Sequence, residues 1–251
     1  MKRLAFIPLI GAVLVLLGIA LEPAVLSPYH RAILVISLVL TGFSGLVTAS
    51  RFSRGDRLLL SWALIGAGYL FSAIRHGVRM AAYFDSSIVL PPAMNSALAI
   101  AQNVAIALAL LLFVLAWRAT GLTAPVSRGA QILSTLAGIA VAAIVGGYPL
   151  LKALGGTGTD PIMLVSTAGD IIGLSLIVPL ALSALAMRGG LLMHTWVYLA
   201  ASELAWLFYD LIWSMLPSDP STTDTSILEA LRITAVLFAF AATVAQRRAM
   251  R

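Results

Sequence analysis

The sequence is built from long apolar runs that are separated by short polar, proline-containing or glycine-containing breaks. A helix needs about 20 mainly apolar residues to cross the roughly 30 Å of hydrocarbon in a bilayer. With 61% hydrophobic and 10% charged residues, the chain meets that requirement repeatedly. We therefore predict an all-α, polytopic membrane helix bundle that forms one integral membrane domain over residues 1–251. Eight transmembrane helices are predicted, at 4–21, 31–50, 57–84, 94–117, 129–153, 161–187, 191–215 and 226–247.

The basic residues in the breaks predict the orientation. If the N-terminus is cytoplasmic, eleven lysines and arginines lie on that side, and only Arg31 and Lys152 lie on the other. Cytoplasmic loops of membrane proteins carry such an excess, so we predict that both termini are cytoplasmic. The net charge of +6 then reflects anchors beside anionic lipid headgroups, and we expect no nucleic-acid partner.

The first apolar segment has two interpretations. Lys2 and Arg3, an apolar stretch and the small residues at 18–20 also fit a signal peptide with a cleavage site. Cleavage would leave seven helices with the N-terminus outside. We favour a retained first span because the internal duplication described next requires it.

The two halves of the chain align with each other at an offset of 134 residues. This offset superposes three pairs: Trp62 on Trp196, Tyr69 on Glu203, and His76 on Asp210. One interpretation is a duplication into parallel four-span repeats, 1–120 and 126–251, related by an axis along the membrane normal. The other is a chance alignment of helices rich in leucine and alanine. A duplication would place the natural binding site between the third and seventh helices.

Charged side chains inside the predicted spans are the strongest functional signal. A charge at the bilayer centre costs about 2.5–3.5 kcal/mol, so such residues usually face the bundle interior. Helical spacing places five residues on or beside one face of the third helix: Tyr69, Ser72, Arg75, His76 and Arg79. The seventh helix carries a second polar stripe of Glu203, Trp206, Tyr209 and Asp210. We predict that the two stripes meet, with the arginines paired to the carboxylates.

Polar residues of two further helices lie at comparable depth, and a pocket in the outer half of the bilayer follows. The predicted ligand-binding residues are Tyr69, Ser72, Arg75, His76, Arg79, Asn95, Gln102, Asp170, Glu203, Trp206, Tyr209 and Asp210. In this hypothesis the arginines hold an anionic or carbonyl-bearing group, and the aromatic residues surround its apolar part. Two other interpretations are more local: Glu229 and Arg232 form an ion pair one turn apart, and His30 lies in an outer loop.

Several kinds of chemistry lack the residues that they need. The chain has no cysteine, which excludes disulfides, iron–sulfur clusters and thiolate nucleophiles. Only two lysines are present, neither in the middle of a span, so a retinal Schiff base is disfavoured. The three histidines lie at different depths without metal-binding spacing. We therefore predict no metal, no cofactor and no catalytic residue.

Two segments resemble the multi-helix membrane sensor regions at the N-terminus of bacterial signalling proteins, including diguanylate cyclases. They are Gly55-Asp56-Arg57-Leu58 with Trp62 and Gly66-x-Gly68-Tyr69, and the aromatic and acidic run 203–213. The resemblance implies ligand or lipid sensing in a bacterial cytoplasmic membrane. No output domain follows within the sequence, so we expect a separate signalling partner or a homo-oligomer.

The favoured hypothesis is an integral membrane receptor or ligand-binding protein that is not an enzyme. Its partners would be membrane lipid and a small or amphiphilic ligand. The first alternative is a proton-coupled small-molecule transporter that uses buried carboxylates. The second is a lipid-directed membrane enzyme with Glu203 and Asp210 as acid and base.

Overall fold

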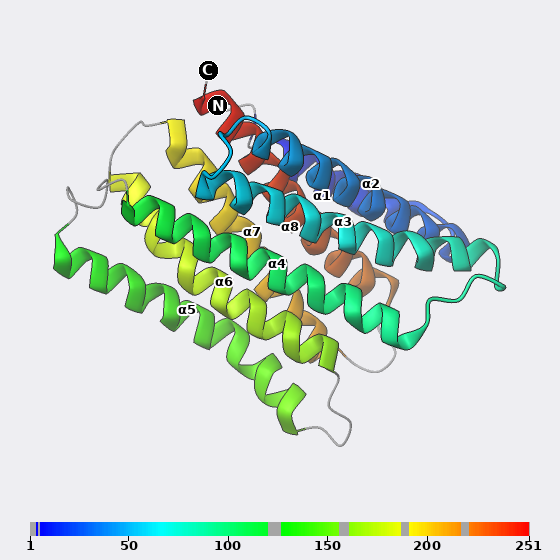
Figure 1. Ribbon diagram of the computed structural model, residues 1–251. Helices are drawn as coiled ribbons and strands as arrows, with labels where there is room; N and C mark the ends of the chain where they lie inside the picture. The colour runs from blue at the N-terminus through cyan, green and yellow to red at the C-terminus, as the bar shows by residue number, and fades with distance from the viewer. Residues whose placement is uncertain are drawn as a thin grey trace.

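The computed structural model describes residues 4, 6–119, 127–155, 161–186, 191–216 and 221–250, and all its regular elements are helical (Figure 1). The all-α prediction is confirmed for these residues. In chain order the elements are α1 (Phe6–Leu17), the 3₁₀ helix η2 (Gly18–Ala20), α2 (Pro23–Ala49), α3 (Arg57–Phe84), α4 (Pro92–Ala119), α5 (Arg128–Gly155), α6 (Pro161–Ala186), α7 (Leu191–Met215) and α8 (Thr222–Ala249).

Six of the described helices are long and apolar enough to cross a membrane. They are Val25–Ala49, Arg57–Phe84, Pro92–Ala119, Arg128–Lys152, Ile162–Leu182 and Thr222–Ala249. The first predicted span is shorter than expected, because α1 has 12 residues. At 1.5 Å per residue it is about 18 Å long, against the roughly 30 Å of a bilayer core. The seventh helix, α7, has 25 residues but carries His194, Glu203 and Asp210, and it is not among the six.

The helix ends differ from the prediction mainly at α2 and α8. Helix α2 begins at Pro23, eight residues before the predicted start, and continues through Pro28, which lies outside the predicted spans. A proline at the first helical position lacks only an N–H that would have no partner there. Helix α8 begins at Thr222, before the predicted residue 226, because Ser221 and Asp224 form a capping box.

Six helices pack around a common interior. Each packs on the next in the order α2, α3, α4, α6, α7 and α8, and α8 closes the ring against α2. Helix α1 packs on α8, and α5 covers α6 and α7 from outside (Figure 1). Both chain ends lie at the same end of the bundle.

The half of the bundle near the chain ends is filled by apolar and aromatic side chains. Phe113 contacts the rings of both Trp62 and Trp196, with centroid distances of 4.9 and 5.2 Å. All three side chains are buried. Edge-on ring contacts of this kind add to the stabilisation from burial. The buried carboxyl groups of the described residues, Asp170, Glu203 and Asp210, lie in the other half of the ring.

Candidate functional site

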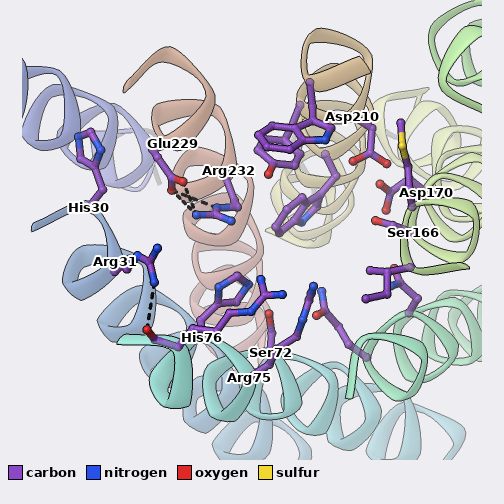
Figure 2. A pocket seen from close by; sticks show the side chains of 18 of the residues that line it. His30, Arg31, Ser72, Arg75, His76, Ser166, Asp170, Asp210, Glu229 and Arg232 are labelled. Carbon is purple, nitrogen blue, oxygen red and sulfur yellow. Dashed lines mark hydrogen bonds and ion pairs between the residues drawn. The ribbon is translucent and has the colours of Figure 1, made fainter. Parts of the chain in front are cut away.

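A cavity of about 740 Å³ lies inside the ring of six helices, in the half remote from the chain ends (Figure 2). Its lining residues come from the first halves of α2, α4, α6 and α8 and from the second halves of α3 and α7. This pattern follows from the alternating direction of the helices, which brings these segments to one level. The lining includes the exposed residues Thr222 and Thr225, so the cavity extends to that end of the bundle.

The structure brings most of the predicted site residues together. Eleven line the cavity: Ser72, Arg75, His76, Arg79, Asn95, Gln102, Asp170, Glu203, Trp206, Tyr209 and Asp210. Tyr69 is not among the lining residues. Its side chain is buried, and its hydroxyl lies 3.4 Å from the hydroxyl of Ser202 on α7. Tyr69 therefore joins α3 to α7 next to the cavity.

Three carboxyl groups form an acidic wall on α6 and α7. Asp170, Glu203 and Asp210 are only 7%, 4% and 6% exposed. The hydroxyl of Thr167 donates to Asp210 Oδ2 at 2.8 Å. Asp170 Oδ2 has no hydrogen-bond partner among the residues that the structure describes. A buried acceptor without a donor costs free energy, so this atom marks a place where a donor from outside the protein would be stabilising.

Glycine at position 173 makes room for the Glu203 carboxyl. A Cβ atom built on Gly173 would lie 2.3 Å from Glu203 Oε2 and 3.0 Å from Leu110 Cδ1. Gly173 follows Asp170 by three residues on α6, so the Glu203 carboxyl packs one turn along the helix from Asp170. The close approach of these two helices thus collects the acidic groups at one side of the cavity.

Basic side chains occupy the opposite side. Arg75 donates through Nε to Asn95 Oδ1 at 2.8 Å, which joins α3 to α4. Arg31 of α2 donates to the backbone carbonyl of Arg79 at 3.0 Å. Figure 2 shows Arg31, Arg75 and His76 across the cavity from Asp170 and Asp210. Direct pairing of Arg75 or Arg79 with Glu203 or Asp210 stays a prediction.

The predicted local ion pair on α8 is confirmed. Arg232 binds Glu229 through a salt bridge, and both residues also line the cavity (Figure 2). The Arg232 guanidinium carbon lies 5.7 Å from the centroid of the Tyr209 ring, which is within the range of a cation–π contact. Arg232 therefore contacts both Glu229 on its own helix and the Tyr209 ring on α7.

The contribution of α2 and α8 to the site was not predicted from the sequence. His30 was expected in an outer loop, but it lies in α2, is 2% exposed, and its Nε2 is 3.3 Å from the carbonyl oxygen of Val15. A signal for α8 was present: four polar residues recur at i, i+3, i+7 and i+10, and all line the cavity. They are Thr222, Thr225, Glu229 and Arg232.

The described residues contain no group of three or more histidine and carboxylate side chains arranged to hold a metal ion. What the arrangement offers is separated charge around a cavity that is large enough for a small molecule. Comparisons with known protein families, with curated proteins and with solved structures find no match to this chain.

Proposed function

We propose that the chain is an integral membrane protein that binds a small or amphiphilic ligand in this cavity and signals through a separate partner or a homo-oligomer. One observation carries the proposal: polar, charged and aromatic side chains from six helices surround a cavity of about 740 Å³. Ligand sites typically have volumes of about 300–1,000 Å³, with a few polar groups among apolar walls. Charges are expensive inside a bilayer and usually mark function there.

The proposed topology has eight membrane passes with both termini in the cytoplasm of a bacterial cell. Helix α7 completes the ring between α6 and α8, and its carboxyl groups point away from lipid. Leu4, just before α1, is buried, and the N-terminus lies at the same end of the bundle as the C-terminus (Figure 1). This supports a first pass that reaches the cytoplasmic half of the bundle. The excess of basic residues at the end that carries the chain termini supports the orientation.

Ligand-dependent stabilisation of the purified protein tests the binding proposal. The full chain in lipid nanodiscs would be melted with and without fractions of a polar and lipid extract of the expression host. We expect at least one fraction to raise the melting temperature, and Arg75→Gln to abolish this shift. Arg54→Gln is the matched control, because Arg54 is exposed in the α2–α3 connection. Equal shifts for the parent and Arg75→Gln would contradict binding in this cavity.

Proton-coupled transport is the second candidate, favoured by the three buried carboxyl groups and by His76 in the same cavity. Chains of acidic residues and histidine in membrane proteins are typical of proton relays. The test is uptake of the stabilising fraction into proteoliposomes with an imposed proton gradient. Gradient-dependent uptake that is lost in Asp170→Asn supports transport, and binding without uptake supports a receptor.

A further inference from the structure

The acidic and basic side chains that line the cavity are equal in number, counted as arginines against aspartates and glutamates, and they are separated in space. Four arginines and four carboxylates contribute: Arg31, Arg75, Arg79 and Arg232, with Asp170, Glu203, Asp210 and Glu229. Glu229 and Arg232 form an ion pair with each other. The remaining basic residues lie on α2 and α3, whereas the remaining acidic residues lie on α6 and α7.

We propose that the ligand of this cavity is a zwitterion, with an ammonium group that carries N–H bonds and an anionic group such as a carboxylate or phosphate. The ammonium group binds among Asp170, Glu203 and Asp210, and the anionic group binds at Arg75 and Arg79. This inference rests on the proposed ligand-binding function and specifies its ligand class.

Asp170 determines that the cationic group must be a hydrogen-bond donor. Its Oδ2 atom is buried and has no partner among the described residues, and in the ionised form a carboxylate oxygen only accepts. An ammonium N–H satisfies this acceptor and also supplies the opposite charge. A quaternary ammonium group has no N–H and would leave the acceptor unsatisfied. Trp206 lines the same cavity one turn from Glu203 and provides an aromatic surface for the cation.

The basic side has the properties of an anion site. Asn95 accepts from Nε of Arg75, which orients the guanidinium group, and Arg31 binds the backbone carbonyl of Arg79. Guanidinium groups present several donors in a planar fork that matches a carboxylate or phosphate. A ligand with a single charge would interact with only one of the two walls.

Two sources share this chemistry. One is a free zwitterion that enters from the end of the cavity where Thr222 and Thr225 are exposed. The other is the headgroup of an aminophospholipid. The probes must therefore include soluble molecules and membranes of defined headgroup.

The experiment compares matched probes on the purified full chain in phosphatidylcholine nanodiscs. The soluble probes are ω-amino carboxylates from glycine to 6-aminohexanoate and phosphoethanolamine, each with its N-trimethyl analogue, and the separate amines and acids. The lipid arm replaces phosphatidylcholine by phosphatidylethanolamine. We expect one N–H zwitterion, free or as the lipid, to raise the melting temperature. For a free zwitterion, the affinity should be about tenfold or more above that of its N-trimethyl analogue and of either half.

Variants identify the groups responsible. Asp170→Asn should weaken both the binding of the N–H zwitterion and its preference over the N-trimethyl analogue, because the amide keeps one acceptor oxygen but loses the negative charge, whereas Asp85→Asn should preserve both. Asp85 is exposed beyond the end of α3, where the Ser87 hydroxyl and backbone N–H lower the pKa of its carboxyl. If Asp170→Asn does not fold, Glu203→Gln serves for the same comparison.

The outcomes separate this inference from the proposed function. If an anion alone binds as tightly as every zwitterion, or if N-trimethyl analogues bind equally well, the zwitterion inference is wrong and the cavity remains a ligand site. The zwitterion inference is also wrong if none of these probes binds while an extract fraction gives stabilisation that depends on Arg75. If neither probes nor extract fractions give such stabilisation, the proposed function is wrong.

Discussion

Arg75 and Asn95 link α3 to α4 at the edge of the cavity. Asn95 Oδ1 accepts from Arg75 Nε at 2.8 Å. This hydrogen bond is partly buried, and removal of one partner costs more than the bond contributes on average where the other partner stays desolvated. The position of the guanidinium group therefore depends on a side chain twenty residues further along the chain.

We predict that Asn95→Ala lowers the stability of the protein by about 1–3 kcal/mol, because the Arg75 guanidinium loses an acceptor of a charge-assisted hydrogen bond. The measurement is thermal unfolding of the purified protein in nanodiscs. Asn95→Asp is the matched control, since it keeps an oxygen acceptor at the same position and should melt near the parent. Equal destabilisation by both variants would show that the amide itself, and not the acceptor, is needed.

Gly173 offers a second prediction for a single residue. In Gly173→Ala the new Cβ would lie 2.3 Å from Glu203 Oε2, so the carboxyl must move. We expect ligand-dependent stabilisation to weaken by at least about threefold in apparent affinity, because small displacements at a binding site reduce complementarity. In the control Gly147→Ala the added Cβ meets nothing within 4 Å. Parent-like binding by Gly173→Ala would place Glu203 outside the site.

For individual residues, the sequence predicted which charged side chains face the interior better than it predicted the side chains that they contact. Asp170 and Arg75 were found because a charge in an apolar run needs an interior location. Tyr69 lies on the same helix as Arg75, but helical spacing does not give the depth at which a cavity ends, and the Tyr69 hydroxyl lies beside Ser202 instead. Arg31 was missed as a site residue because the second span was predicted to begin at residue 31, whereas α2 begins at Pro23 and continues through Pro28.

Helices α2 and α3 approach each other closely through glycine. A Cβ atom on Gly45 would lie 2.8 Å from the Cα of Gly66, and one on Gly66 would lie 2.8 Å from the carbonyl oxygen of Gly42. The obstructing atoms belong to the backbone, so they cannot rotate away. Small residues at helix contacts permit such close packing within membranes, where dispersion replaces the hydrophobic effect as the driving force.

We predict that Gly66→Ala destabilises the bundle by about 1–3 kcal/mol, because the extra methyl group forces α2 and α3 apart. Gly77→Ala on the same helix is the matched control, since nothing lies within 4 Å of its added Cβ. The control should be neutral or slightly stabilising, given the better helix propensity of alanine. The measurement is again the melting temperature, and a Gly66→Ala variant that melts like Gly77→Ala would contradict this packing.

At the scale of elements, apolar length predicted the interior of each described helix and local polar chemistry decided the ends. The start of α8 was available in the sequence as Ser221 followed three residues later by Asp224, a capping pattern. The short length of α1 was not, because an apolar run continues through Gly18–Ala20 while the backbone tightens to a 3₁₀ turn. An apolar run indicates only that a segment is buried in lipid or protein, so hydropathy cannot distinguish an α-helix from a 3₁₀ turn.

In the whole molecule, the order of helix neighbours repeats after four helices. Helix α2 packs on α3 as α6 packs on α7, α3 on α4 as α7 on α8, and α2 on α8 as α6 on α4. This order is what a duplication with parallel repeats would produce. The outer helices differ, since α1 packs on α8 whereas α5 packs on α6 and α7. Neighbour order was not predictable from the sequence beyond this alignment, because most helix surfaces are apolar all round and select no particular partner.

The absence of cysteine makes the proposed topology directly testable. Single cysteines would be introduced as Ser53→Cys between α2 and α3, and as Ser87→Cys between α3 and α4. With α3 crossing the membrane outward, we expect a membrane-impermeant maleimide to label Ser87→Cys in intact bacteria, and Ser53→Cys only after the cells are opened.

A third position tests whether α7 and α8 complete the bundle. Thr222→Cys, at the start of α8, should be labelled in intact cells like Ser87→Cys, because both lie at the end of the bundle to which the cavity extends. The unmodified chain, which lacks thiols, gives the background. Labelling of Ser53→Cys and protection of the other two would invert the orientation and place the cavity toward the cytoplasm. Protection of Thr222→Cys alone would mean that an odd number of passes separates it from Ser87, and the eight-pass arrangement would then be wrong.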